Sequence, residues 1–198
     1  MAVFRVTTTP AEVLELDDVK VILKDPPSTD DDYISLLITI AREWAETLTG
    51  LAFTLRTVNE YWDEWPSDNG IFRLALSPLR ALTSMKYLGG DGTLTVFSPT
   101  PAIQSDLISF PSRLRCATAF PLIGDYMNGV QAVYTVGFDS TGVAAPVLPA
   151  PIKEAMLLMI ADWYENRVDF DVNVPGPLGG SRERQSLNIL RRYQVNRV

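Results

Sequence analysis

The chain has 198 residues, 46% of them hydrophobic and 10% aromatic, a composition typical of one globular domain with or without appendages. It contains one cysteine and no histidine, so an intrachain disulfide and any Ser–His or Cys–His nucleophile pair are excluded. Histidine is also the commonest general acid–base group and zinc ligand. The sequence therefore predicts no enzyme, and we expect no catalytic residue, no metal site and no cofactor.

The net charge of −7 is unevenly distributed. Residues 181–198 carry five arginines and one acid, Glu183, which gives +4 and leaves −11 on the other 180 residues. An acidic body with a basic tail indicates that the tail docks on an acidic partner. The body is a poor candidate for wrapping nucleic acid, because affinity for phosphates requires clustered lysine and arginine.

The chain also lacks the expected marks of a membrane or secreted protein. Its longest apolar run, 155–161, is too short to cross a bilayer. Its first residues lack the charged region and long apolar core of a signal peptide. We therefore expect a soluble protein, without a membrane partner, that stays in the cytoplasm in which it is made.

Two helices are predicted near the start of the chain, at about 16–24 and 29–49. In the second, apolar residues recur at three- and four-residue spacing from Tyr33 to Leu48, after capping residues at its start and before Gly50 at its end. Pro26 and Pro27 separate the two helices. The pair is predicted to form an N-terminal αα-hairpin.

The pattern changes to strands between about 52 and 137. Alternation with a period of two and intervening turn residues predict six or seven strands, at 53–61, 71–76, 82–88, 93–97, 103–110, 113–117 and 130–136. The Gly-Gly-Asp-Gly turn at 89–92 is the clearest hairpin signal. Because the strands run together and do not alternate with helices, we expect antiparallel pairing and an α+β fold.

A long helix is predicted at about 150–167. Pro149 and Pro151 suit a helix entrance, and the apolar residues that follow stack on one face. Core packing accounts for that face. A sharper alternative is that the apolar arc of this helix is wider than core packing requires, and that the additional residues are buried against a neighbouring subunit. The candidate interface residues are Leu157, Leu158 and Tyr164.

The acidic clusters are not predicted to form sites. The consecutive carboxylates Asp30, Asp31 and Asp32 point in different directions and suit the positive N-terminal end of a helix. Asp63 and Glu64 follow the predicted strand 53–61, and adjacent residues of an extended chain face opposite sides. The neighbouring tryptophans Trp62 and Trp65 are expected to contribute to the core or to a subunit contact.

The expected domain organisation is a body of residues 1–170 followed by a Gly/Pro linker and an extended basic tail at 171–198. Within the tail, 183–193 could form a short helix but offers little apolar face.

Several phrases in this order resemble the head–tail connector, or head-completion adaptor, proteins of long-tailed bacteriophages. They cover about residues 14–167 and read LDDVK at 16–20, DDYISLLITIAREWAETLTG at 31–50, LSPLRALTSMKYL at 76–88 with GDG at 90–92, VYTVGF at 133–138, and VLPAPIKEAMLLMIADWYENR at 147–167. The family's tail commonly contains a Leu-x-Pro-Tyr-Arg-like element. The segment 189–195 is similar but lacks the proline.

The resemblance implies a structural virion protein of the neck, present in the host cytoplasm before assembly. Such subunits form a ring, commonly twelve-fold, beneath the portal. DNA passes through the lumen without sequence-specific binding, and the ring is a platform for a stopper or tail-completion protein. In related adaptors the C-terminal segment engages the portal protein. That role is carried over to Arg182, Arg184, Leu190, Arg191, Arg192 and Tyr193.

Two other classes of function stay open on the sequence alone. One is a DNA-binding accessory protein of head completion that acts through its arginine-rich tail, which requires salt-sensitive duplex binding. The other is a metal-dependent hydrolase or nuclease, which the absence of histidine and the divergent carboxylates disfavour.

Overall fold

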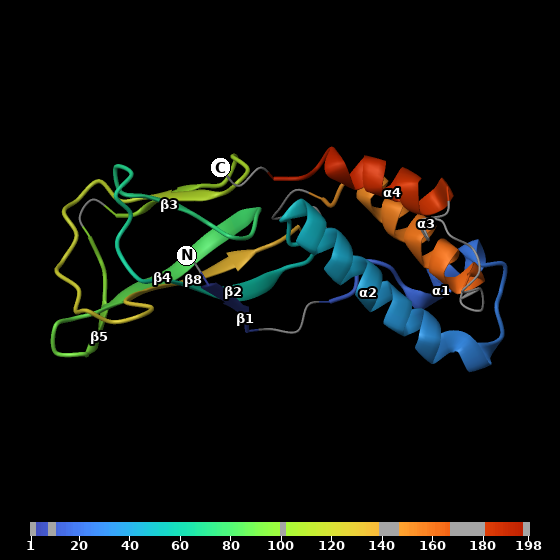
Figure 1. Ribbon diagram of the computed structural model, residues 1–198, viewed down its shortest axis with the longest axis horizontal. Helices are drawn as coiled ribbons and strands as arrows, with labels where there is room; N and C mark the ends of the chain where they lie inside the picture. The colour runs from blue at the N-terminus through green and yellow to red at the C-terminus, as the bar shows by residue number, and fades with distance from the viewer. Residues whose placement is uncertain (1–2, 8–10, 100–101, 139–146, 167–180, 196–198) are drawn as a thin grey trace, which may run out of the picture. The chain divides into compact units, whose positions relative to one another are not determined.

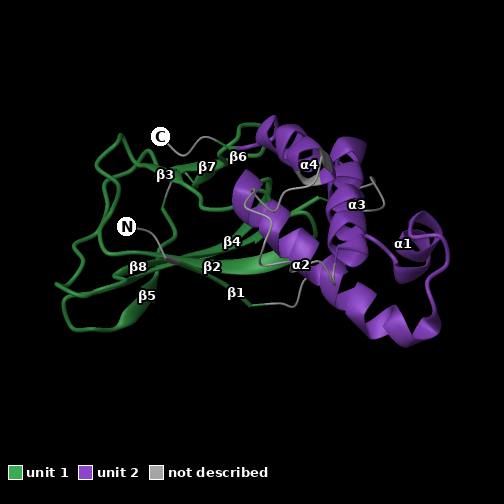
Figure 2. Ribbon diagram, turned by 45° about the vertical axis from the view of Figure 1, so that its right-hand side comes forward, with its two compact units in different colours: residues 1–11, 50–146, 195–198 green, residues 12–49, 147–194 purple. Residues whose placement is uncertain are grey.

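A computed structural model describes residues 3–7, 11–99, 102–138, 147–166 and 181–195 (Figure 1). The chain divides into two compact units (Figure 2). Unit 1 comprises residues 1–11, 50–146 and 195–198 and contains the strands, and unit 2 comprises residues 12–49 and 147–194 and contains the helices. Helices and antiparallel strands are thus segregated into different units, which confirms the predicted α+β class.

Unit 2 is built from α1 (Leu16–Ile22), the 3₁₀ turn η1 (Ser28–Asp30), α2 (Asp31–Thr49), α3 (Ala150–Glu165) and α4 (Ser181–Arg191). The three helices predicted from periodicity are all present. Pro151 lies in the first turn of α3, where a missing N–H costs no hydrogen bond. Helix α3 packs against α2 and α4, and α1 contacts α2 and α3.

The core of unit 2 follows from the apolar periodicity of α2 and α3. Their buried apolar residues recur at three- and four-residue intervals, so each helix covers one stripe of the other. These residues are Ile34, Leu37, Ile38, Ala41 and Ala45 on α2 and Ile152, Ala155, Met156, Met159 and Ile160 on α3. Burying a side chain of this size contributes about 1.5–3 kcal/mol relative to leaving it exposed.

Helix α4 is the main difference from the sequence-based expectation of an extended tail. Residues 181–191 form a helix that packs against α2 and α3. Its contact side includes Leu190 and the small Ser186, both with no exposed surface. The small Ser186 permits close approach to the neighbouring helices, and Leu190 supplies buried apolar surface. The predicted linker at 171–180 lies outside the described residues.

Unit 1 contains a five-stranded antiparallel sheet in the order β1-β2-β8-β4-β5. The strands are β1 (Val3–Val6), β2 (Arg56–Trp62), β4 (Leu79–Leu88), β5 (Leu94–Val96) and β8 (Val130–Val136). The predicted hairpin at 89–92 joins β4 to β5. Strand β8 lies between β2 and β4, and it alternates buried and half-buried residues as expected for a sheet with one face on the core.

A second, three-stranded sheet has the order β3-β7-β6. It consists of β3 (Ile71–Arg73), β6 (Gln104–Asp106) and β7 (Arg113–Arg115), and β6 contacts β4 of the larger sheet. Phe72 and Leu114 face the core, together with Val58, Met85 and Tyr134 of the larger sheet. The predicted strand 103–110 is shorter in the structure, because residues 107–112 form the β6–β7 loop.

Two further features tie the strands of unit 1 together. The fully buried Glu60 accepts a hydrogen bond from the hydroxyl of Tyr134 at 2.5 Å and from the amide of Ala75 at 3.1 Å. Trp65 stacks on Phe120 with ring centroids 4.6 Å apart, inside a cluster of aromatic rings. The expectation that Trp65 contributes to packing is therefore met within unit 1.

Candidate assembly surfaces

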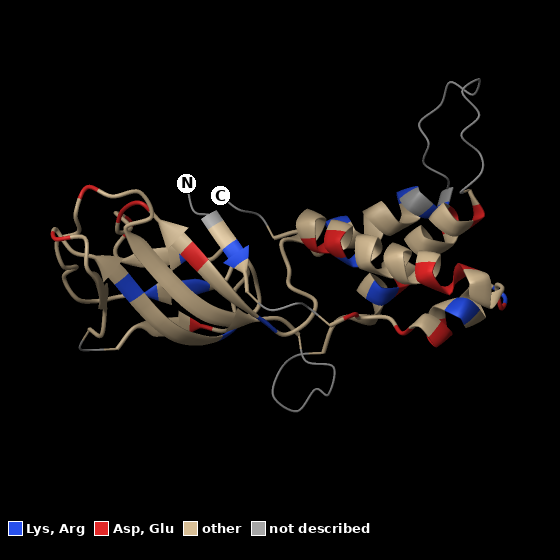
Figure 3. Cartoon of the chain, turned by 90° about the horizontal axis from the view of Figure 1, so that it is seen from below, with Lys and Arg blue, Asp and Glu red and all other residues tan. Residues whose placement is uncertain are grey.

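Charge is divided unequally between the two units (Figure 3). Among the described residues, unit 1 has seven basic and seven acidic side chains, and unit 2 has eight basic and fourteen acidic ones, a net of −6. Unit 2 is therefore the acidic part of the chain. An acidic surface attracts basic partners and repels the phosphate backbone of nucleic acid.

The β6–β7 loop is held in one conformation by Asp106. Its Oδ1 accepts hydrogen bonds from the amides of Ile108 and Ser109, both at 3.1 Å. Its Oδ2 accepts from Nε and Nη2 of Arg113, at 3.1 Å and 2.6 Å. Arg113, followed by the amide of Ser109, holds the pKa of the Asp106 carboxyl well below its usual range. The carboxylate is therefore charged at neutral pH, and its hydrogen bonds to the amides at the start of the loop and to Arg113 after it anchor both ends of the loop.

This fastened loop presents three large apolar side chains to solvent. Leu107, Ile108 and Phe110 are 53%, 86% and 52% exposed. We call these three residues the β6–β7 knob. Such a group in an ordered loop is a feature of binding surfaces, because the loop loses little further conformational freedom when it binds.

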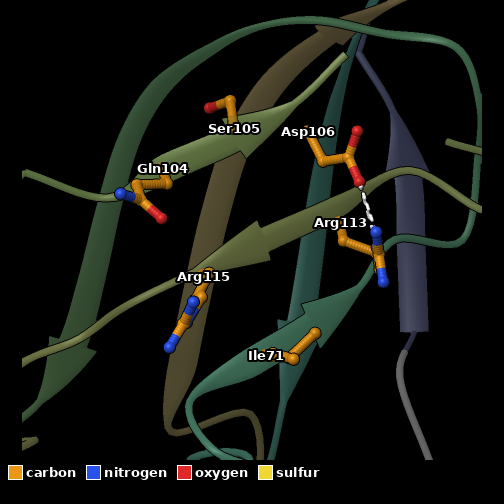
Figure 4. Close-up of a pocket in the computed structure, with 6 residues that line it drawn as sticks. All are labelled: Ile71, Gln104, Ser105, Asp106, Arg113 and Arg115. Atoms are coloured by element: carbon orange, nitrogen blue, oxygen red, sulfur yellow. Dashed lines mark hydrogen bonds and ion pairs between the residues drawn. The ribbon is translucent and has the colours of Figure 1, made fainter. Parts of the chain in front are cut away.

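Next to the knob is a shallow hollow of about 470 Å³ in unit 1 (Figure 4). It is lined by Ile71, Gln104, Ser105, Asp106, Arg113 and Arg115. Arg73, Arg113 and Arg115 all lie on the outer face of the small sheet, since they alternate with the core-facing Phe72 and Leu114.

Two of these three arginines have carboxylate partners. Arg73 pairs with Asp68 at 3.3 Å, and Arg113 pairs with Asp106. Within the described part of the chain, Arg115 makes no ion pair. The hollow therefore offers one exposed guanidinium that can accept an additional carboxylate or phosphate oxygen.

An exposed stripe of different character runs along α2 in unit 2. Asp32, Leu36, Ile40 and Glu43 recur at three- and four-residue spacing and are all exposed. Leu36 is 54% and Ile40 is 42% exposed. We call these four residues the α2 stripe. It combines an apolar pair with a carboxylate at each end.

A third exposed apolar group surrounds the β4–β5 turn. Leu122 is 93% and Met127 is 87% exposed, and Leu94 is 48% exposed at the start of β5. The amide of Gly124 donates to the carbonyl of Leu88 at 3.1 Å, which connects the 121–129 loop to this turn. The turn and the loop thus form one surface of unit 1, with several apolar side chains available to a partner.

The residues predicted to lie at a subunit interface on the long helix are half-buried. The hydroxyl of Tyr164 donates to Asp30 within unit 2, and its ring lies 6.3 Å from that of Tyr33. Leu157 and Leu158 keep part of their surface exposed. Their assignment to an interface between subunits stays a prediction, and Tyr164 already has an intramolecular role.

The residues predicted to bind the portal lie on α4 and just beyond it, in two different environments. Arg184, Arg191 and Arg192 are exposed, and Tyr193 is half-buried. Arg182 pairs with Glu165, and Leu190 has no exposed surface. In this conformation Leu190 therefore serves the core of unit 2, and the exposed arginines are the members of the set that a partner can reach.

The acidic clusters are used in local pairs. Asp31 binds Nζ of Lys20 at 2.7 Å, and Asp63 accepts from the amide of Asn128 at 2.9 Å. Among the described residues, no group of three His, Cys, Asp or Glu side chains is arranged to hold a metal ion. Within the same residues, no helix is long and apolar enough to cross a membrane.

The sequence reasoning did not find the knob, the hollow or the α2 stripe. The predicted strand 103–110 includes Leu107, Ile108 and Phe110, although Asp106 and Ser109 before a proline are typical of a turn held by side-chain hydrogen bonds. For the α2 stripe, the available signal was an apolar arc on that helix wider than one core face requires.

Nearly the whole of this chain has a fold also found in neck and virion structures of gene transfer agent (GTA) particles. A chain in the neck of an empty GTA particle, computed with C6 symmetry, superposes with a TM-score of 0.76 at 19% identity over 99% of this chain and 97% of that chain. A chain from the virion of a native GTA particle superposes with a TM-score of 0.72 at 17% identity, over 98% of this chain and 96% of that chain.

A chain from the neck of a native GTA particle, computed with C12 symmetry, gives a TM-score of 0.62 at 18% identity over 96% of this chain and 97% of that chain. No protein-family model and no curated protein matches the sequence. At these identities the likeness shows a shared fold. It covers both units and nearly the full length of each compared chain.

Proposed function

We propose that this chain is a structural subunit of the neck of a tailed phage or phage-like particle. Its role would be that of a head–tail connector, or adaptor: a non-catalytic ring beneath the portal that lets DNA pass and carries the stopper or tail-completion protein. The observation that carries the proposal is the full-length fold match to a chain of a GTA particle neck. The ordered sequence resemblance to phage connectors points to the same class.

The surfaces of the chain suit assembly into a ring. A closed ring requires two different patches on each subunit, one for each neighbour. Unit 1 offers the exposed knob, and unit 2 offers the exposed α2 stripe. Ring symmetry also agrees with the C6 and C12 symmetries with which the two neck structures were computed.

The charge of unit 2 suits a DNA passage better than a DNA-binding surface. Its described residues carry a net charge of −6. Carboxylates that face a lumen repel phosphates, so DNA slides without being held. The exposed arginines of α4 then serve a protein partner, and we assign that partner as the portal protein.

The first experiment is to locate the chain by cryo-electron microscopy of the neck of purified particles. The proposal requires density for a ring of this chain against the portal. A neck that lacks the chain at this position would refute the proposal, and the DNA-binding accessory role would then take precedence.

The portal contact is tested by replacing Arg184, Arg191 and Arg192 with alanine. Deleting the tail would be ambiguous, because it removes the buried Leu190 and would disturb unit 2. The triple variant should fold but be recruited poorly to portal-bearing heads. Replacing the exposed Lys24 and Lys153 of the same unit provides the control.

Normal recruitment of the triple variant would rule out α4 as the portal contact. The same proteins distinguish the alternative role. A DNA-binding accessory would bind duplex DNA in a salt-sensitive manner, and the triple variant would lose that binding.

A further inference from the structure

The β6–β7 knob and the α2 stripe have complementary chemistry. The knob combines three exposed apolar side chains with the arginine hollow beside it. The stripe combines the exposed Leu36 and Ile40 with an acid at each end. An apolar centre with one available cation, Arg115, can therefore meet an apolar centre with a carboxylate at each end.

The spacings also agree. On α2, the midpoint of the apolar pair is about five residues from Glu43, or roughly 7.5 Å at 1.5 Å per residue. On β7, Arg113 is the first residue after the loop that carries the knob, and Arg115 lies two residues further, roughly 6.6 Å along the strand from that end of the loop. The guanidinium of Arg115 can thus reach a carboxylate at one end of the stripe while the knob covers the apolar pair.

We infer that the knob and hollow of one copy bind the α2 stripe of a second copy, and that this head-to-tail contact joins neighbouring subunits. The occupant is a second copy because the same chain carries both complementary surfaces, on different units. Two unlike patches give a heterologous contact, which closes into a ring when the rotation between subunits permits. The inference rests on the proposed function and adds to it the residues of the subunit contact.

Individual side chains have defined roles in this contact. Ile108, the most exposed member of the knob, would cover Ile40 and Leu36 of the neighbour. Arg115 would pair with Glu43, which is 67% exposed and only loosely held by its own Arg42 at 3.6 Å. Asp106 and Arg113 would act as positioning residues, because they fasten the loop and do not themselves need to touch the neighbour.

The contact is tested with full-length variants that each carry one added cysteine besides the native Cys116. The native Cys116 is buried and gives the wild-type background. Copies with Ile108→Cys are mixed with copies with Ile40→Cys and treated with a short thiol-to-thiol linker. The inference predicts linked dimers at a rate at least about fivefold above that of a Leu122→Cys and Ile40→Cys mixture, since Leu122 is equally accessible but lies outside the knob.

Equal rates in the two mixtures would overturn the inference. Preferential linking of two Ile108→Cys copies to each other would also overturn it, because that outcome indicates a two-fold contact. In the Ile108→Cys copies, adding Arg115→Glu should slow the linking about fivefold, and Glu43→Lys in the other copies should restore it. Slowing without restoration would mean that the acid partner of Arg115 is not Glu43.

Two outcomes separate this inference from the proposed function. A ring of the chain in the neck without 108–40 linking in particles leaves the function standing and refutes the contact. Selective linking by a chain that is absent from the neck supports the contact and refutes the function. Loss of DNA binding on Arg115→Glu, with unchanged linking, would instead assign the hollow to phosphate.

Discussion

Replacing Tyr134 with phenylalanine should destabilise unit 1 by about 2–3 kcal/mol. Tyr134 has no exposed surface, and its hydroxyl donates at 2.5 Å to the equally buried Glu60. The ring is retained, so no cavity forms and the change removes only what the hydroxyl contributes, including its hydrogen bond to Glu60. A hydrogen bond to a charged group contributes about 1.5–3 kcal/mol, and here a buried carboxylate is also left with one donor fewer.

The expected loss is measurable by urea unfolding followed by tryptophan fluorescence and by thermal unfolding. For a chain of this length, each kcal/mol lowers the melting temperature by about 2–4 °C, so the change should lie near 4–12 °C. Hydrogen exchange should show that the destabilised amides are those of the five-stranded sheet.

The matched control is Tyr61→Phe. The Tyr61 hydroxyl accepts a hydrogen bond from Gln131 at 3.2 Å on the half-exposed face of the same sheet, and its loss should cost less than about 1 kcal/mol. If Tyr134→Phe costs no more than Tyr61→Phe, then the Glu60 hydrogen bond does not hold these strands together as argued.

Three other changes have defined expected outcomes. Gly70→Ala should unfold unit 1 or strongly lower its melting temperature, because Gly70 has a φ of +72° and an added Cβ would lie 2.2 Å from a backbone carbonyl oxygen. The control is Gly90→Ala, where an added Cβ meets open space, and equal melting temperatures of the two variants would contradict this reasoning. Leu190→Ala should cost about 2–5 kcal/mol in urea unfolding and the exposed Arg191→Ala less than about 0.5 kcal/mol, and similar values would show that α4 is not packed. Asp106→Asn should accelerate exchange of the two loop amides at pH 7. The pKa of the Asp106 carboxyl is lower in the folded protein than its value of about 3.9 in the unfolded chain. The carboxylate therefore stabilises the loop fully above about pH 3.9, and this stabilisation is lost as the pH falls through the lowered pKa. In the wild-type protein, protection of the two loop amides should persist to well below that pH.

The helices were predictable because the signals that specify a helix, apolar spacing and end residues, lie within the helix's own sequence. The apolar spacing in α2 and the prolines at the start of α3 define where each helix lies, and both agree with the structure within a few residues. The β4–β5 hairpin was predictable for the same reason, since a glycine-rich turn specifies its own strand pairing.

The order of the strands was not predictable from local pattern. Strand β2 pairs with β8, and Val58 faces Tyr134 across a long sequence separation. Such pairing depends on which strand faces pack into the same core, and the alternation of apolar and polar residues along one strand does not specify its partner. The division into two sheets was missed for the same reason.

The packing of α4 and the candidate surfaces depend on three-dimensional context. The tail segment shows one large fully buried apolar residue, Leu190, so its sequence resembles a solvated helix. The knob is recognisable only when Asp106 is seen to fasten the loop, because the same apolar run inside a strand would be core.

The order in which the chain is synthesised has a consequence for its folding in the cell. Helix α2 ends at residue 49, and its packing partner α3 begins at residue 150, so about 100 residues of unit 1 are translated between them. At a translation rate of about 5–20 residues per second, the apolar side of α2 stays without its packing partner α3 for roughly 5–20 s. Unit 1 can fold during this interval, and nascent chains paused there should recruit chaperones through the face that contains Ile34, Leu37 and Ala41.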